Sequence, residues 1–169
     1  MDAADLPGPS VVTTQTLSSR IEDLLAAVVD PEIPVLTIGD LGVLRGVTVA
    51  GDGAVAVTIT PTYSGCPALG VIEEDIVSVL KAAGYDRVAV NTVFSPPWTT
   101  DWMTDDARRR LRDYGIAPPG SAGTDPEPVV CPRCSATETT VVSPFGSTAC
   151  KALMVCSQCR EPFDHFKAI

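Results

Sequence analysis

Two pairs of closely spaced cysteines near the C-terminal end constrain the fold of this chain most. Cys131 and Cys134 form one C-x2-C pair, Cys156 and Cys159 form the other, and 21 residues separate the pairs. Both sulfurs of such a pair can reach one ion, and four thiolates suit tetrahedral Zn²⁺. A zinc-ribbon-like β module over residues 131–169 is therefore predicted, with structural zinc as the cofactor that so short a module needs for stability. A rubredoxin-like iron site, a redox dithiol pair and an iron–sulfur cluster remain alternatives, because each also uses thiolates.

Cys150 and His165 are the other side chains of this module that could take part in chemistry. Cys150 is a candidate extra thiolate, either as a substitute ligand or as a free thiol whose pKa is lowered by Lys151. A buried structural role is the alternative. His165 is the single histidine and lies between two phenylalanines, which is more typical of packing than of ligation or acid–base catalysis.

Residues 15–116 carry alternating helical and strand patterns typical of a small α+β domain. The periodicity of apolar residues and the turn signals predict helices over about 18–29, 67–84 and from 104 onward, and strands over 43–50, 54–60 and 87–94. The order α-β-β-α-β-α indicates one sheet covered on one side by helices. In the C-terminal module, 139–142 and 152–155 are expected to supply the strands.

Two segments lack any periodicity. Residues 1–14 predict a flexible tail, and residues 117–130, which are rich in Pro, Gly and Ser, predict a linker between the two domains.

Composition excludes several classes of function. The longest uninterrupted apolar run, 24–29, has six residues, whereas a bilayer-spanning helix needs roughly 20, so no membrane association is expected. The acidic start differs from a signal peptide, and a cytoplasmic location with reduced thiols is expected. The net charge is −9, and residues 1–130 alone carry −10. A nucleic-acid binder usually has the opposite balance, so nucleic acid is not expected as a partner.

Cys66 is the isolated thiol of the first domain. It precedes Pro67, which is expected at the first helical position, so the helix N-terminus should lower the pKa of Cys66. A small buried cysteine that fills a corner is the structural alternative. Because iron–sulfur clusters normally need four ligands, a cluster at Cys66 would need a second chain, a partner protein or exogenous thiols. That stoichiometry is typical of a carrier, and it leaves a homodimer open.

Three carboxylates near turns, Asp30, Glu32 and Asp40, could run general acid–base chemistry, although caps of turns and helices are the more common use of such residues. Trp98 and Trp102 are expected to cover apolar surface or to anchor a partner. The arginines between 108 and 112 predict a solvated helical face, with a docking surface as the alternative.

The motifs together resemble a known family. DPEIP (30–34), DLG (40–42), TPTYSGCP (60–67) and PWTTDWMT (97–104) resemble the MIP18/DUF59 family of iron–sulfur assembly factors. With CPRC (131–134), FGSTACKAL (145–153) and CREPF (159–163) added, the chain from about residue 18 onward resembles the D-component family of bacterial phenylacetyl-CoA epoxidase systems.

The resemblance implies an accessory maturation factor in phenylacetate catabolism and not an enzyme. Such a factor would deliver an iron–sulfur cluster or iron to the reductase or oxygenase subunits of the epoxidase, and the cluster would be bound transiently. Cys66 would be the transfer thiolate, and the residues that support its loop would be Asp30, Glu32, Asp40, Thr60, Ser64 and Gly65. A non-catalytic scaffold subunit that stabilises the epoxidase complex is the alternative. The chain lacks a Glu-x-x-His di-iron motif and a Gly-x-Gly-x-x-Gly nucleotide loop, which agrees with an accessory role.

Overall fold

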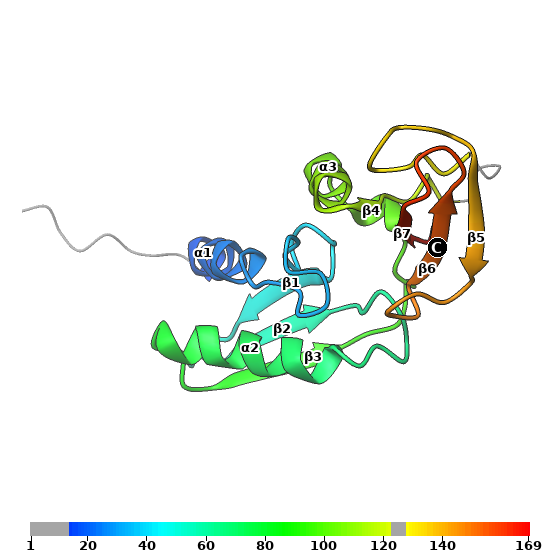
Figure 1. Ribbon diagram of the computed structural model, residues 1–169. Helices are drawn as coiled ribbons and strands as arrows, with labels where there is room; N and C mark the ends of the chain where they lie inside the picture. Colours follow the sequence, from blue (N-terminus) through cyan, green and yellow to red (C-terminus); the bar gives the residue numbers. More distant parts are fainter. Residues whose placement is uncertain (1–13, 123–127) are drawn as a thin grey trace, which may run out of the picture.

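The computed structural model describes residues 14–122 and 128–169 and contains two β-sheets (Figure 1). The first sheet has the order β1 (Leu44–Val49), β2 (Val55–Ile59), β3 (Val88–Thr92), and the second has the order β4 (Ile116–Ala117), β7 (Pro162–Phe166), β6 (Lys151–Cys156), β5 (Thr139–Ser143). The helices are α1 (Thr14–Ala26), α2 (Leu69–Ala82), the short 3₁₀ helix η1 (Thr100–Trp102) and α3 (Asp105–Tyr114). The predicted α+β class with a C-terminal β module is confirmed.

The first sheet combines a hairpin with a parallel crossover. β1 and β2 are antiparallel and turn at Gly53, whose φ of +82° lies in the left-handed region that favours glycine. β2 then pairs in parallel with β3 through the crossover helix α2. Alternate residues of β2 (Val55, Val57, Ile59) are buried beneath α1 and α2, which contact each other on the same face. The sheet is thus covered on one side, as the alternating pattern predicts.

Helix α1 differs from its predicted bounds because it runs over Thr14–Ala26 instead of 18–29. The spacing of Ser19 and Glu22 fits a capping box, but Ser19 lies inside the helix. After Ala26 the chain turns, Val28 N donates to Leu25 O at 3.0 Å, and Val29 forms an isolated antiparallel bridge with Thr37. The backbone pairing of Val29 and the proline at 31 both oppose continuation of the helix to residue 29.

The C-terminal module is joined to the first domain by strand pairing and by a shared core residue. β4 lies directly after α3 and pairs in parallel with β7, so the second sheet includes residues ahead of position 131. Phe166 of β7 is 1% exposed and belongs to the core of the first domain, with its ring centroid 6.1 Å from that of Trp98. Thr100 N also donates to Ile169 O at 3.2 Å. Residues 1–13 of the predicted tail and 123–127 of the predicted linker lie outside the described residues.

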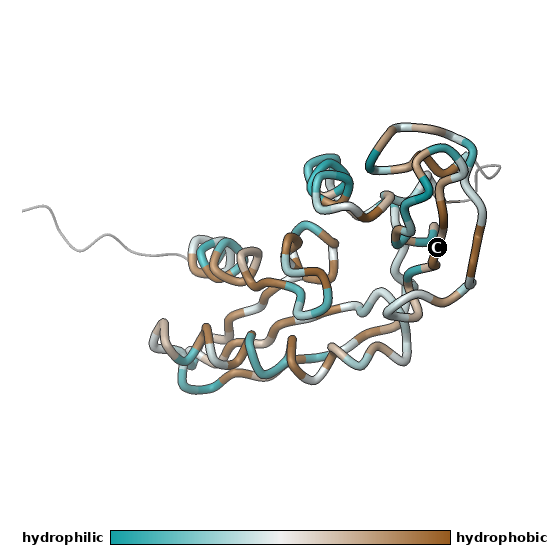
Figure 2. Tube along the Cα trace, viewed as in Figure 1, coloured by the Kyte–Doolittle hydropathy of each residue, from teal (hydrophilic) through white to brown (hydrophobic). Residues whose placement is uncertain are grey.

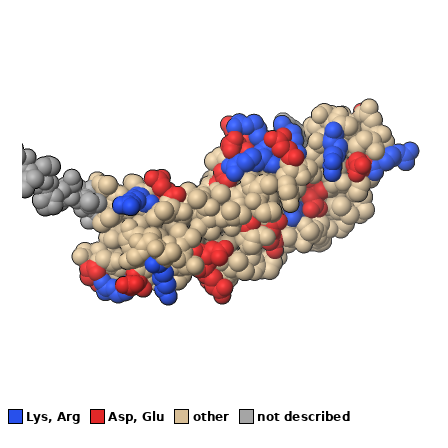
Figure 3. All heavy atoms as spheres, turned by 60° about the vertical axis from the view of Figure 1, so that its left-hand side comes forward, with Lys and Arg blue, Asp and Glu red and all other residues tan. Residues whose placement is uncertain are grey.

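Helix α3 is hydrophilic over most of its surface (Figure 2), and its arginines lie together with acidic residues (Figure 3). Two of its arginines contact segments outside the helix. Arg108 donates to Thr100 O at 2.7 Å, and Arg110 donates to Val35 O at 3.1 Å and pairs with Asp106 at 2.8 Å. These two side chains therefore fasten the helix to its neighbours. No helix within the described residues is long and apolar enough to span a membrane.

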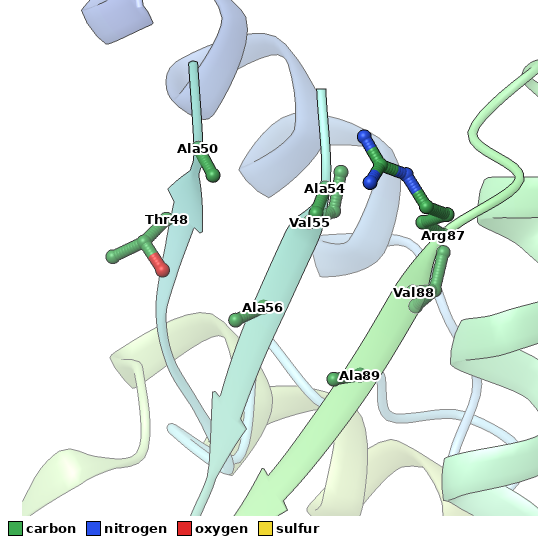
Figure 4. A pocket seen from close by; sticks show the side chains of 8 residues that line it. All are labelled: Thr48, Ala50, Ala54, Val55, Ala56, Arg87, Val88 and Ala89. Carbon is green, nitrogen blue, oxygen red and sulfur yellow. The ribbon is translucent and has the colours of Figure 1, made fainter. Parts of the chain in front are cut away.

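The face of the first sheet opposite the helices carries a shallow hollow lined by small side chains, among them Thr48, Ala56 and Ala89 (Figure 4). The charged side chain at its rim, Arg87, pairs with Asp52 at 2.8 Å. None of the residues that line the hollow is a cysteine, a histidine or an acid. The hollow offers no group for chemistry, so the candidate site lies elsewhere.

Candidate functional site

The two cysteine pairs lie in turns of the same shape. Ser135 N donates to Cys131 O at 3.0 Å, and Arg160 N donates to Cys156 O at 3.0 Å. Ser135 and Arg160 follow their pairs with φ values of 62° and 65° in the left-handed region. Each turn thereby folds its two sulfurs toward the same point.

The four sulfurs fit one tetrahedral ion. Cys131 Sγ lies 3.7 Å from Cys159 Sγ, Cys134 Sγ lies 3.6 Å from Cys156 Sγ, and all four sulfurs lie within 4.8 Å of one another. Zn–S bonds of about 2.3 Å place tetrahedral sulfurs about 3.8 Å apart. The Cys159 N–H, which donates to Cys156 Sγ at 3.5 Å, also lowers the pKa of the Cys156 thiol. The four cysteines are therefore placed to hold one metal ion, and a full shell of four thiolates would leave no coordination position open to a substrate.

Cys66 lies ahead of helix α2 and not at its cap. The helix begins at Leu69 with Ala68 as the cap residue, while Cys66 closes a turn in which its N–H donates to Tyr63 O at 3.1 Å. The expected lowering of its pKa is wrong. Cys66 is half-buried, and this burial raises the pKa of its thiol. The nearby carboxylates of Glu32 and Asp30 raise the pKa further. Together these effects outweigh the hydrogen bond from the Ala68 N–H, which lowers the pKa.

The acidic turn beside Cys66 is shaped by Asp30. Asp30 is 8% exposed, and its Oδ1 accepts hydrogen bonds from Glu32 N and Ile33 N, both at 2.8 Å. These bonds fix the backbone that carries the Glu32 carboxylate. Asp30 therefore acts as a turn cap, and the turn brings the negative charges of Asp30 and Glu32 near the Cys66 thiol.

Cys150 lies in the β5–β6 connection, next to the β2–α2 loop that carries Cys66 (Figure 1). Both cysteines are half-buried and pack against the core of the first domain. The Cys150 sulfur lies 3.0 Å from Thr148 Oγ1. Of the alternatives for Cys150, a free thiol with a lowered pKa is wrong: burial raises the pKa of the Cys150 thiol, outweighing both the Thr148 hydrogen bond and the Lys151 ammonium.

Asp40 belongs to a different contact network from Cys66. Its Oδ2 accepts from Thr37 N at 2.9 Å and from Thr37 Oγ1 at 2.8 Å, its Oδ1 pairs with Arg110, and its carbonyl accepts from Thr104 N at 3.1 Å. These contacts fasten the loop after α1 to the start of α3. Burial alone would raise the pKa of Asp40, but the Thr37 hydrogen bonds and the Arg110 guanidinium outweigh it and lower the pKa.

The Asp40 network predicts an acid-dependent part of the stability. Because the folded pKa of Asp40 lies below its ordinary value of 3.8, its contribution is complete above that pH and is lost as the pH falls further. We expect Asp40→Asn to lower the free energy of unfolding at pH 7 and to flatten its decline below pH 4, measured by urea denaturation across a pH series. The exposed Asp23→Asn is the control. If the free energy of unfolding of Asp40→Asn declined below pH 4 as steeply as that of the parent, the assignment would be contradicted.

The other predicted residues of the Cys66 loop lie in distinct environments. Thr60 is 1% exposed, and its Oγ1 has no hydrogen-bond partner among the described residues. Ser64 and Gly65 are exposed, and a Cβ at Gly65 would meet the Tyr63 ring at 3.0 Å.

The remaining candidate residues from the sequence are the single histidine and the two tryptophans. His165 is half-buried in β7, its Nδ1 lacks a hydrogen-bond partner among the described residues, and it does not join the four cysteines. Trp98 is buried and donates from Nε1 to Leu41 O at 2.8 Å. The guanidinium of Arg45 covers the Trp102 ring at 3.7 Å. Trp98 thus covers apolar surface, as expected.

Two family models match successive parts of the chain. The iron–sulfur cluster assembly protein model matches residues 18–92, and the PaaD zinc beta ribbon domain model matches residues 116–167. The first match contains Cys66 and the second contains Cys150 and the four-cysteine site.

Similar proteins cover the whole chain or its first domain. A protein of Escherichia coli K12 named as the D component of 1,2-phenylacetyl-CoA epoxidase is 54% identical over 149 residues, which are 86% of this chain and 90% of that protein. An Fe–S protein maturation auxiliary factor of Porphyromonas gingivalis W83 is 40% identical over 52% of this chain and 84% of its own length. The crystal structure of a DUF59 domain from Bacillus anthracis has a TM-score of 0.54 and 31% identity, over 58% of this chain and 93% of that domain. The chain therefore belongs to the D-component family of 1,2-phenylacetyl-CoA epoxidases, and in it an iron–sulfur cluster assembly domain is followed by a PaaD zinc beta ribbon domain.

Proposed function

We propose that this chain is a non-catalytic maturation factor of the phenylacetyl-CoA epoxidase system, which delivers an iron–sulfur cluster or iron to the reductase or oxygenase subunit. The observation that carries the proposal is the Cys66 thiol, which stays partly accessible in the β2–α2 loop beside the acidic turn that Asp30 caps. The names of the relatives, an epoxidase D component and an Fe–S maturation auxiliary factor, support the same role.

The chemistry of the proposed transfer is ligand exchange. The Cys66 thiol loses its proton to solvent as its sulfur binds an iron of the cargo, and a thiolate of the client later replaces that sulfur. One protein ligand is easily displaced, whereas a shell of four is not. The acidic turn at Asp30 and Glu32 favours a cationic iron centre at this point over an anion.

The four-cysteine site has a different role in the proposal. Cys131, Cys134, Cys156 and Cys159 hold zinc as a structural ion, which fixes the turn ahead of β5 and the turn between β6 and β7. The closed shell leaves no coordination position for a substrate, so this site takes no part in the transfer.

The test uses cells that depend on this chain for growth on phenylacetate. The chain is replaced by Cys66→Ser, with Ser78→Ala at an exposed position of α2 as the control, and iron and acid-labile sulfide are measured in the purified reductase and oxygenase. We expect Cys66→Ser to lower the metal content of one of these clients and to slow growth, and Ser78→Ala to change neither. Fully loaded clients and normal growth with Cys66→Ser would refute the transfer role.

A scaffold role is the second candidate, and exposed apolar side chains on β5 and on the connection after it favour it. Val141, Val142 and Phe145 are 55%, 58% and 64% exposed. A scaffold would co-purify stably and stoichiometrically with the epoxidase subunits, and substitution of these three residues by serine would abolish that association. A carrier would associate only transiently, so the same purification distinguishes the two candidates.

A further inference from the structure

Strand β3 forms a free edge of the first sheet. Just outside the two ends of β3, Arg87 O accepts a hydrogen bond from β2 and Val93 N donates one to β2, both at 2.9 Å. Because backbone groups alternate in direction along a parallel strand, the N–H and C=O groups of Val88, Val90 and Thr92 point away from β2. Within residues 14–122 and 128–169, no strand lies beyond them.

The other three edges of the two described sheets are blunted, as exposed edges in natural proteins usually are. β1 and β5 each have an irregular register, and β4 has two residues. β3 pairs without a register shift over its five residues, and its sequence, VAVNT, contains no charged residue and no proline. Among the described strands, β3 is therefore the edge that is open to pairing with another strand.

A groove runs between this edge and helix α2, which lies along β3 (Figure 1). Val90 of β3 and Val77 of α2 line the groove and are half-buried. Glu74 and Lys81 line it as well, are exposed, and lie about two helical turns apart on one stripe of α2. The stripe is thus acidic on one side of Val77 and basic on the other.

Such a stripe is complementary to a copy of itself that runs in the opposite direction. A two-fold axis at Val90 pairs β3 with the β3 of a second copy in antiparallel order, so that the two Val90 residues exchange both backbone hydrogen bonds. Thr92 Oγ1 donates to Glu73 at 2.8 Å, which ties α2 to β3. The same axis therefore sets the two α2 helices antiparallel, and Glu74 of each copy lies opposite Lys81 of the other.

We propose that the chain forms a homodimer in which the two β3 strands join the first sheets into one continuous sheet and the two α2 helices lie side by side above it. The backbone groups of Val88, Val90 and Thr92 bond the strands across the interface. Ion pairs between Glu74 and Lys81 fix the antiparallel order, because parallel helices would place like charges together. The dimer goes beyond the delivery role and does not depend on it, so either can fail alone.

The first experiment measures the mass of the full zinc-loaded chain by sedimentation equilibrium over a concentration series. We expect a monomer–dimer equilibrium for the wild type. Lys81→Glu and Glu74→Lys each place like charges opposite one another and should each weaken the dimer at least about tenfold. Asp23→Lys, an equally exposed charge reversal on α1, should dimerise like the wild type. A monomeric wild type, or a dimer that both variants leave unchanged, overturns the proposal.

An equimolar mixture of the two variants tests whether the residues face each other. Lys81→Glu carries two acids on the stripe and Glu74→Lys carries two bases, so a heterodimer of the two contains only opposite-charge contacts. We expect the mixture to dimerise about as tightly as the wild type, although each variant alone is weakened. A mixture that remains as weak as its components overturns the proposed arrangement, and restored pairing also shows that both variants are folded.

Amide hydrogen exchange tests the pairing of the strands. In the dimer the amides of Val88, Val90 and Thr92 are hydrogen-bonded across the interface, whereas those of the two intervening residues bond to β2 in either state. We expect the first set to exchange slowly in the wild-type dimer and fast in monomeric Lys81→Glu, and the intervening amides to stay slow in both. Equal exchange of the Val90 amide in dimer and monomer would exclude pairing through this edge.

Discussion

Removal of the metal from the four-cysteine site is expected to unfold the second sheet and to expose Trp98 to solvent. The core that holds this sheet together is small, and two of the metal ligands, Cys131 and Cys156, belong to it. Structural zinc contributes about 10–16 kcal/mol of apparent binding free energy in zinc-finger peptides, and such free energy is folding free energy. Without the ion, the core has too little apolar surface to hold the strands.

The exposure of Trp98 follows from its contact with β7. Phe166 packs on the Trp98 ring, so this strand uncovers the indole when it detaches. The measurement is tryptophan emission during titration with a chelator, in a Trp102→Phe background so that Trp98 alone reports. We expect a red shift that follows metal release, and the same shift without chelator in Cys156→Ser. Cys150→Ser, which leaves the four ligands intact, should emit like the parent. Unshifted emission from a chain shown to be free of metal would contradict the assignment.

The metal site could be predicted because its signal is local. Two residues between the cysteines of a pair suffice to place both sulfurs on one ion, and the structure brings the four together as expected. The hairpin and the helix after Pro67 were predictable for the same reason, since turn residues and apolar periodicity act over a few positions. The predicted start of a helix at residue 104 is likewise confirmed, since Thr104 caps α3 and its Oγ1 accepts from Ala107 N at 3.0 Å.

The surroundings of Cys66 could not be predicted, because they depend on contacts between distant segments. The expectation of a lowered pKa assumed that the helix begins at Pro67, whereas α2 begins at Leu69 and burial dominates the environment of the thiol. No spacing rule relates Cys150 to Cys66. Strand β7 was also missed, since Pro162 and the polar pair at 164–165 interrupt its alternation, and its pairing with β4 depends on the fold of the whole chain.

Phe166→Ala is expected to destabilise the chain by about 3–5 kcal/mol, which is the usual cost of deleting a fully buried aromatic ring. Phe166 is 1% exposed and lies in the core of the first domain, although it belongs to the second sheet. Its loss removes packing against Trp98 and weakens the connection between the two sheets. We therefore expect the single urea transition of the parent to separate into two. The measurements are the fluorescence emission of Trp98 and amide hydrogen exchange in β5 and β6.

Phe145→Ala is the matched control for this change. Its ring is 64% exposed and contacts the Lys167 ammonium at 4.7 Å, so its truncation should alter the free energy of unfolding by no more than about 0.5 kcal/mol. A comparably small effect of Phe166→Ala, with one transition retained, would mean that the two sheets are held together without this ring. The backbone pairing of β4 with β7 would then be the connection that matters. In that case Ala117→Pro, which cannot donate to the ladder, should produce the two transitions instead.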